Sequence, residues 1–128
     1  MRLGYVILYT PNVRASLDFY ARAFGLKARF VHESGTYAEM ETGETILAFL
    51  DEEPAQISTP NFAPNRRDLR PAGAEIGLVV ADVAAAFAIA VGAGAAPILK
   101  PTLKPWGQTV AYVRDGDGFL VELCTPMS

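Results

Sequence analysis

The chain contains very few of the side chains that build disulfides, zinc sites and most redox centres. Among its 128 residues there is one cysteine, Cys124, and one histidine, His32. A single cysteine excludes an intramolecular disulfide, and the sequence has neither a CxxC motif nor a Cys/His cluster with zinc spacing. This cysteine usage is typical of a reducing compartment, and we expect a cytoplasmic protein.

Positive charge and long hydrophobic runs are also scarce. The net charge of -3 and the pI of 5.1 argue against nucleic-acid binding, which relies on clustered Lys and Arg. We interpret the basic cluster at residues 66–70 as a solvated loop rather than an anion site. The longest apolar stretches, residues 76–80 and 84–91, are far shorter than the roughly 20 residues of a membrane helix. No export signal is visible at the N-terminus. We therefore expect neither a nucleic-acid nor a membrane partner.

The sequence does contain an internal repeat, and a repeat constrains the architecture more than any single motif. In the first half, the β-rich run at residues 4–9 is followed by apolar residues with helical spacing. These residues are Val13, Leu17, Tyr20 and Phe24. Asn12 is placed to cap this helix, and Gly25 lies where a left-handed residue would end it.

The second half repeats the same order of features. A strand-like run covers Glu75 to Val80, Asp82 occupies the cap position, and Gly92 and Gly94 close the helix. The apolar stripe of this helix consists of Val83, Phe87, Ala90 and Val91.

Three β-prone segments follow each helix. They are residues 26–32, 36–41 and 45–50 in the first half, and 97–100, 108–114 and 119–124 in the second. A glycine-containing turn joins each final pair, at residues 42–44 and 115–118, as hairpins require. The pattern therefore predicts the element order βαβββ in both halves, and we predict an α+β protein.

Length and composition favour one domain covering residues 1–128, with module one at 1–50 and module two at 74–128. Residues 51–73 contain four prolines, and their apolar residues follow no sustained helical or strand periodicity. We therefore interpret them as a linker. A four-stranded sheet with one helix leaves one face uncovered. The uncovered sheet face of each module must therefore pack against the other module or against a second chain. We expect a homodimer.

Several local patterns resemble one family. Residues 11–20 with Phe24-Gly25-Leu26 resemble the first helix of the vicinal-oxygen-chelate superfamily, which includes glyoxalase, bleomycin-resistance and extradiol-dioxygenase relatives. Residues 104–107 and 111–122 resemble its closing hairpin, with Asp115-Gly116-Asp117-Gly118 in place of the usual Asp-Pro-Asp-Gly turn. The resemblance implies the glyoxalase/bleomycin-resistance/dioxygenase fold, in which paired βαβββ modules form a curved sheet cleft.

The resemblance also implies where metal ligands would lie, on the first and last strands of each module. These positions hold Tyr5, Glu75, Ala48 (or its neighbour Leu47) and Glu122, and only Glu122 matches the family pattern. A borderline metal prefers imidazole, thiolate or several carboxylates. His32 lies on a different strand, and we interpret it as an ordinary strand residue. We therefore expect no metal and no cofactor. This expectation argues against a metal-dependent dioxygenase. It places the chain nearest to the metal-free bleomycin-resistance-like branch.

Two interpretations of the acidic residues stay open. If Glu75 and Glu122 converge, repulsion and burial would raise at least one pKa, giving a proton-sharing pair or a site for a cation. Alternatively, Glu75 starts a strand near solvent and Glu122 is satisfied by backbone N–H groups or by Arg114. Cys124 shares a face with Glu122, and we expect a small buried residue there rather than a nucleophile.

Aromatic residues supply the other candidate contacts. Trp106 precedes a strand, so its indole either stacks on a planar or cationic ligand or plugs the end of the sheet. Tyr5, Tyr9 and Tyr112 alternate along strands, a pattern that fits core packing and ligand contact alike. The candidate ligand-binding residues are Tyr5, Ala48, Glu75, Trp106 and Tyr112, with Glu122 as the candidate catalytic residue.

Three functions fit these features. The first is a metal-free protein that binds a small planar or cationic molecule. The second is a glyoxalase-like lyase or isomerase with Glu122 as general base, since a positioned carboxylate of raised pKa can do this work. The third is a regulatory module whose pocket is filled.

Overall fold

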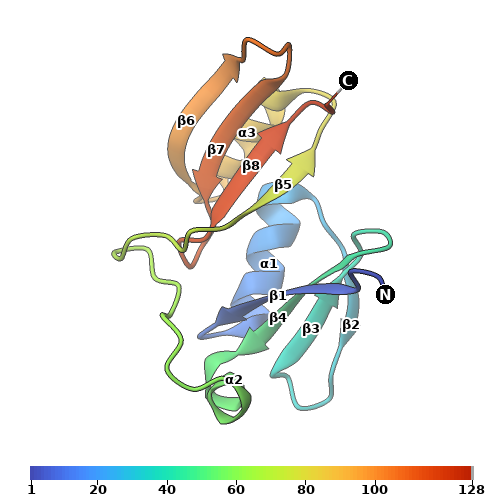
Figure 1. Ribbon diagram of the computed structural model, residues 1–128, viewed down its shortest axis with the longest axis vertical. Helices are drawn as coiled ribbons and strands as arrows, with labels where there is room; N and C mark the ends of the chain where they lie inside the picture. Colours follow the sequence, from blue (N-terminus) through green and yellow to red (C-terminus); the bar gives the residue numbers. More distant parts are fainter. Residues whose placement is uncertain (128) are drawn as a thin grey trace. The chain divides into compact units, whose positions relative to one another are not determined.

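The first half of the chain forms a four-stranded mixed sheet, shown in the computed structural model, which describes residues 1–127 (Figure 1). Its elements are β1 (Tyr5–Thr10), α1 (Val13–Phe24), β2 (Ala28–Val31), β3 (Tyr37–Met40), β4 (Ile46–Asp51) and α2 (Glu52–Ser58). The strand order is β1-β4-β3-β2, and β1 runs parallel to β4. The βαβββ order predicted for module one is therefore confirmed.

The second half repeats this topology. Its elements are β5 (Glu75–Val79), α3 (Val83–Gly92), β6 (Ala96–Leu103), β7 (Thr109–Arg114) and β8 (Leu120–Cys124). The strand order is β5-β8-β7-β6, and β5 runs parallel to β8. Two mixed sheets with three helices give the predicted α+β class.

The chain divides into two compact units. The first unit contains residues 1–21 and 25–64, and the second contains residues 22–24 together with the chain from Asn65 onward. Each unit is described below by itself. None of the helices in the described residues is long and apolar enough to cross a membrane.

Side-chain caps fix where the two long helices begin. The Asn12 carboxamide oxygen accepts a hydrogen bond from the Ala15 N–H at 3.0 Å, and the Asp82 carboxylate accepts one from Ala85 at 3.0 Å. Each bond satisfies an N–H group that has no partner within its helix. Gly25 ends α1 with φ of 68°, the left-handed conformation that glycine adopts without steric cost. The caps predicted at Asn12, Asp82 and Gly25 are confirmed, whereas α3 includes Gly92 and has Ala93 at its C-cap.

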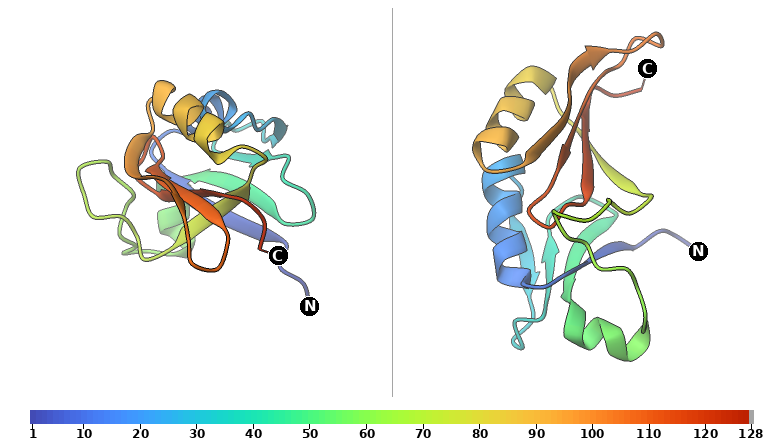
Figure 2. Two further views of the ribbon diagram at one scale, coloured as in Figure 1. Left: turned by 90° about the horizontal axis from the view of Figure 1, so that it is seen from above. Right: turned by 90° about the vertical axis from the view of Figure 1, so that its left-hand side faces the viewer.

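One face of each sheet forms a core. In the first unit Leu8, Ala38 and Phe49 are buried, and the rings of Tyr20 and Phe49 pack with centroids 4.9 Å apart. In the second unit α3 packs against β6, β7 and β8 and covers one face of the sheet (Figure 2). Because side chains alternate along a strand, the opposite face of each sheet carries the candidate site residues that lie on strands.

The segment 51–73 contains a helix that the sequence does not predict. α2 has only seven residues, too few for a clear apolar period, and Pro54 is its third residue. Proline is tolerated in a first helical turn, where the N–H group has no partner within the helix. Beyond α2, the Tyr9 hydroxyl lies 2.9 Å from the Thr59 hydroxyl, and its ring contacts Phe62 edge-on. This part of the predicted linker therefore packs on β1.

β6 is longer than the predicted strand at residues 97–100, because it continues past Pro101 to Leu103. β6 is an edge strand, and proline is tolerated there since no ladder N–H is needed on the open side. The pairing with β7 shifts register twice along this strand.

Candidate functional site

The strand registers place the matched positions of the two modules in equivalent settings. In the first sheet Ala48 lies between Ile7 of β1 and Glu39 of β3. In the second sheet Glu122 lies between Gly77 of β5 and Tyr112 of β7. Tyr5 and Glu75 are therefore equivalent, as are Ala48 and Glu122. Leu47, the alternative position, lies on the opposite face because neighbouring residues alternate.

The second sheet brings two carboxyl groups and a phenol together. The Tyr112 hydroxyl donates to Glu122 Oε1 at 3.0 Å and lies 3.5 Å from Glu75 Oε1. Glu122 and Tyr112 are half-buried, whereas Glu75 is exposed. We call Glu75, Glu122 and Tyr112 the acid cluster.

The neighbours of Glu75 in this cluster shift its pKa. Burial raises the pKa of Glu75 above its ordinary value of 4.5, as do a hydrogen bond with Glu122 and the negative charge of Glu122, while the bond from Tyr112 lowers it. Burial, together with the bond to Glu122 and the charges of both glutamates, raises the pKa of Tyr112 to about 12. The phenol therefore stays a hydrogen-bond donor, and Glu75 keeps its proton to a higher pH than an isolated glutamate does.

Gly77 and Cys124 border the acid cluster. Gly77 is in register with Glu122, and a Cβ at Gly77 would meet no atom within 4 Å, so the space beside Glu122 is open. Cys124 is buried, and its Sγ lies 3.8 Å from the Leu78 carbonyl oxygen. Burial raises the pKa of Cys124, and Glu122 and Glu75 raise it further, so the thiol stays protonated and unreactive.

Arg114 does not pair with Glu122, although it lies on the same strand as Tyr112. Its guanidinium donates instead to backbone carbonyl groups, including that of Gly118 at 2.7 Å. The alternative in which Arg114 satisfies Glu122 is therefore wrong, because these carbonyl groups occupy the guanidinium.

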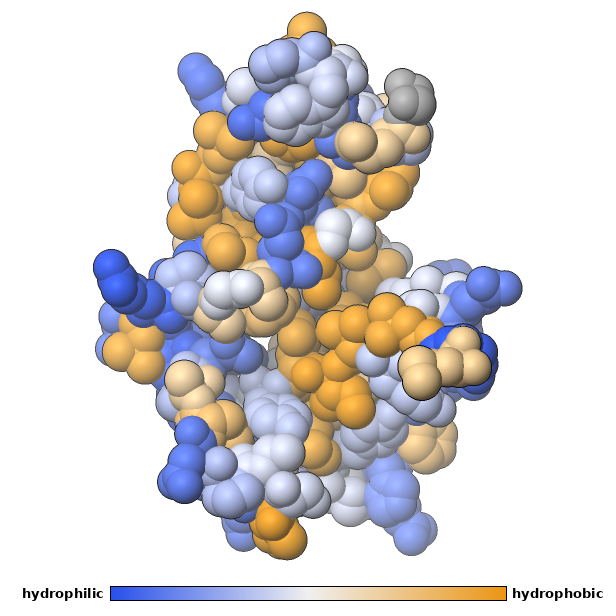
Figure 3. Space-filling model, in the orientation of Figure 1, coloured by the Kyte–Doolittle hydropathy of each residue, from blue (hydrophilic) through white to orange (hydrophobic). Residues whose placement is uncertain are grey.

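The open face of the first sheet is more apolar. Tyr5 is 54% exposed and Ile7 is 43% exposed, and Figure 3 shows hydrophobic side chains over β1. Ala48 is completely buried, since it lies between larger side chains on β1 and β3. Tyr5 therefore presents an aromatic ring at the surface, whereas Ala48 forms the floor beneath its neighbours.

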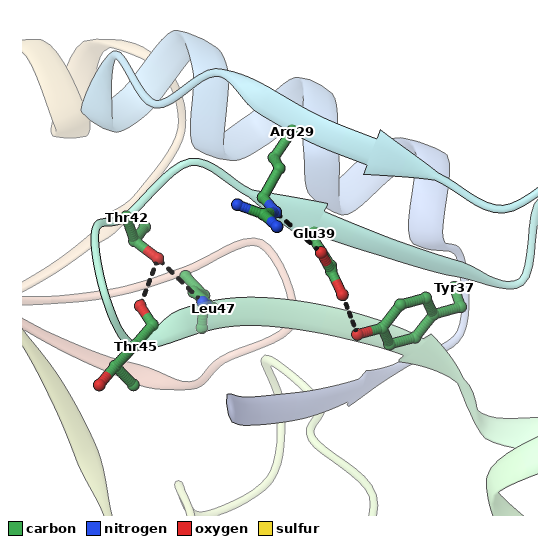
Figure 4. Close-up of polar contacts among 6 residues, drawn as sticks. All are labelled: Arg29, Tyr37, Glu39, Thr42, Thr45 and Leu47. Atoms are coloured by element: carbon green, nitrogen blue, oxygen red, sulfur yellow. Dashed lines mark hydrogen bonds and ion pairs between the residues drawn. The ribbon is translucent and has the colours of Figure 1, made fainter. Parts of the chain in front are cut away.

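A second carboxylate–phenol pair, absent from the sequence predictions, lies on this face (Figure 4). The Tyr37 hydroxyl donates to Glu39 Oε2 at 2.7 Å, and the Arg29 Nε donates to Glu39 Oε1 at 3.1 Å. Burial, with the bond to Glu39 and its charge, raises the pKa of Tyr37. Both carboxylate oxygens of Glu39 are thus engaged, and Arg29 balances its charge. The two-residue spacing of Tyr37 and Glu39 was the sequence signal for a shared face.

Trp106 lies outside the acid cluster, in the turn that joins β6 to β7. The indole is 59% exposed, and its Nε1 donates to Gln108 Oε1 at 2.9 Å. Gln108 in turn donates to the Thr125 carbonyl oxygen at 2.8 Å, which anchors the turn to the chain beyond β8. His32 is exposed, and its Nδ1 lies 2.7 Å from the Ser34 hydroxyl.

The donor set of the acid cluster consists of two carboxylates and a phenol. Among the residues that the structure describes, no three or more His, Cys, Asp or Glu side chains gather so as to hold a metal ion. The cluster contains neither the imidazole nor the thiolate ligands that zinc and non-haem iron prefer, so these residues do not fit a catalytic transition metal.

The sequence is similar to one known protein family, and the fold is similar to that of solved structures. A profile of the Glyoxalase/Bleomycin resistance protein/Dioxygenase superfamily matches residues 2–123. No curated protein matches the sequence. A glyoxalase-related enzyme from Fulvimarina pelagi is similar, with a TM-score of 0.84, 21% identity, and coverage of 98% of this chain and 88% of that one.

Two further solved structures have the same fold. A glyoxalase/bleomycin resistance protein/dioxygenase family enzyme from Burkholderia phytofirmans PsJN has a TM-score of 0.76 and 19% identity, with 98% of each chain covered. TioX from Micromonospora sp. ML1 has a TM-score of 0.73 and 22% identity, again with 98% of each chain covered. Because the profile spans almost the whole sequence, the chain belongs to the Glyoxalase/Bleomycin resistance protein/Dioxygenase superfamily.

Proposed function

We propose that this protein is a metal-free small-molecule-binding protein, and that its acid cluster takes the positive group of a planar cation. The observation that carries the proposal is the convergence of Glu75 and Glu122 on the single hydroxyl of Tyr112. Two carboxyl groups with one proton between them carry a net negative charge and can accept several hydrogen bonds.

The chemistry of the cluster favours an amidinium or guanidinium group. Such a group is planar and donates two parallel N–H bonds, which matches a carboxylate in bidentate geometry. A bound cation takes the place of the proton on Glu75 and offsets the repulsion between the two carboxylates. Gly77 supports this proposal because it leaves open space beside Glu122.

The experiment that tests this function measures binding of benzamidinium by calorimetry and by the shift in melting temperature. We expect saturable binding to the wild type and about tenfold weaker binding to Glu122→Gln, since a charge-assisted hydrogen bond contributes about 1.5 kcal/mol or more. Glu39→Gln is the matched control: Glu39 also accepts a tyrosine hydroxyl, but Arg29 already balances its charge. We expect Glu39→Gln to bind as the wild type does.

Two results would count against this function. The first is a stoichiometric transition metal retained by the purified protein, measured by elemental analysis. The second is a melting temperature that benzamidinium does not raise at any concentration, since a ligand that binds the folded state must stabilise it.

A second candidate function, a lyase or isomerase reaction, is favoured by the pairing of Tyr112 with Glu122 at 3.0 Å. An ionised Glu122 can remove a proton from a carbon next to a carbonyl group, while the Tyr112 hydroxyl stabilises the developing oxygen charge. Exchange of such a carbon-bound proton with deuterium oxide, lost in Glu122→Gln, would support this function. Benzamidinium binding without any exchange would favour the binding protein.

We also propose that the protein works in the cytoplasm as a homodimer. Support comes from the exposed apolar side chains Ile7 and Val79, which lie on the edge strands β1 and β5. Light scattering at micromolar concentration should give twice the mass of one chain, and the mass of a single chain would count against the dimer.

A further inference from the structure

Arg29 and Arg114 both lie on strands next to a strand that carries a glutamate, and they behave differently. Arg29 pairs with Glu39 at 3.1 Å, which neutralises the carboxylate of the first sheet. Arg114 has the same opportunity in the second sheet but makes no carboxylate contact among the described residues. Within the described residues all of its hydrogen bonds go to backbone carbonyl oxygens, so Arg114 does not balance the charge of the acid cluster.

The backbone of Arg114 lies close to the acid cluster. It is paired in register with Leu120, while Tyr112, two residues away on the same face, is paired with Glu122. Arg114 and Glu122 are therefore diagonal neighbours on an antiparallel pair, a separation that a long side chain can span. An unrestrained guanidinium at this position would be attracted to two glutamates.

Four carbonyl groups hold the guanidinium away from the glutamates. Arg114 Nε donates to Gly118 at 2.7 Å, Nη1 to Arg67 at 3.3 Å, and Nη2 to Arg66 at 3.0 Å and to Leu69 at 2.7 Å. Three of these acceptors belong to one short turn, which the Leu69 N–H closes by donating to the Arg66 carbonyl at 3.2 Å. We call residues 66–69 the cradle turn.

The cradle turn has a second anchor and a tight fit. Arg67 Nη1 donates to the Gly94 carbonyl at 2.9 Å, which ties the turn to the loop after α3. A Cβ at Gly118 would lie 2.5 Å from the Arg66 oxygen and 2.6 Å from Arg114 Nη2. Glycine at position 118 is thus what lets the turn and the guanidinium approach the hairpin.

We propose that Arg114 is a positioning residue: the cradle turn holds its guanidinium and thereby keeps the Glu75–Glu122 pair free to take a cation. Displacing the turn releases the guanidinium, which then pairs with Glu122 and occupies the site from within the protein. The inference concerns the acid cluster and rests on the proposed cation site. The charged or titratable groups that meet here are Glu75 of β5, Tyr112 and Arg114 of β7, and Glu122 and Cys124 of β8.

The variant that releases the turn is Leu69→Pro. Leu69 is exposed, so its side chain contributes little, but proline removes the N–H group that closes the turn. Leu69→Ala is the matched control, because it changes the same side chain and keeps the N–H group. Gly118→Ala displaces the turn from the other side and serves as a second, independent variant.

The measurement is the pKa of Glu75, followed through its side-chain carboxyl carbon by NMR. We expect Leu69→Pro and Gly118→Ala to lower this pKa by about one unit, because a cation within roughly 4–6 Å favours the ionised form. We expect Leu69→Ala to leave it unchanged. The double variant Leu69→Pro/Arg114→Gln should return it to the wild-type value, which a purely structural role of the turn would not explain.

Three outcomes separate this inference from the proposed function. An unchanged Glu75 pKa in Leu69→Pro would overturn the inference, as would a lowered pKa that persists in the double variant. Failure of the wild type to bind benzamidinium would overturn the proposed function while leaving the pKa result intact. If both hold, Leu69→Pro should bind benzamidinium about tenfold more weakly than Leu69→Ala, since the released guanidinium competes for the same carboxylate.

Discussion

Gly118→Ala is expected to lower the free energy of unfolding by about 3 kcal/mol, because two separate costs add at this position. Gly118 has φ of 93°, where an L side chain is strained. Its Cβ would also lie 2.5 Å from the Arg66 oxygen, a backbone atom that cannot rotate away. A shift of the hairpin would disturb the Asp115 carboxylate, which accepts bonds at 2.9 Å from both the Asp117 and Phe119 N–H groups.

Gly43→Ala separates these two costs. Gly43 occupies the equivalent turn of the first sheet with the same φ of 93°, but a Cβ there would meet no atom within 4 Å. We expect about 1 kcal/mol for this variant, which reports the backbone strain alone. Urea unfolding followed by circular dichroism gives both values. Equal losses in the two variants would show that the cradle turn is not packed against the hairpin, and would remove the basis for the role of Arg114.

The comparison of these two glycines also shows where sequence reasoning stops. Both turns were predicted from their glycines and from the β-prone segments around them, since turn chemistry is local. The difference between them depends on Arg66, which is distant in sequence and lies in a segment predicted to be an irregular linker. The same limit explains why α2 was missed, because it is short and begins beside a proline. Local patterns predicted the repeated modules, whereas long-range packing determined α2 and the contact between Arg66 and the turn at Gly118.

The candidate site divides in a similar way. The family resemblance implied the equivalence of Glu75 with Tyr5, and of Glu122 with Ala48 or Leu47, and the strand registers favour Ala48. The contact between Glu122 and Tyr112 required knowledge of which strands are neighbours, which period-two patterns do not give. Glu39 was missed for the same reason: only the pairing of β3 with β4 places it beside Ala48.

Binding of a cation to the acid cluster is expected to depend steeply on pH. When Glu75 is protonated, an incoming cation must displace a proton, so its apparent affinity falls as pH decreases through the raised pKa of Glu75. Linkage gives a loss of up to about tenfold per pH unit in this window, and about a hundredfold over two units. Above the pKa of Glu75 its carboxyl group is ionised and the affinity levels off. Benzamidinium stays charged throughout, so only the protein titrates.

Two variants identify the group responsible for this dependence. Glu75→Gln should bind weakly and with little change across the same window, because the titrating carboxyl is gone. Tyr112→Phe should move the midpoint to higher pH, since the Tyr112 hydroxyl bond lowers the pKa of Glu75 and its removal raises that pKa further. Calorimetry in buffers of different ionisation enthalpy measures the protons released on binding. We expect close to one per benzamidinium below the midpoint and none well above it. A midpoint that Tyr112→Phe leaves in place would show that the two glutamates do not titrate as the acid cluster requires.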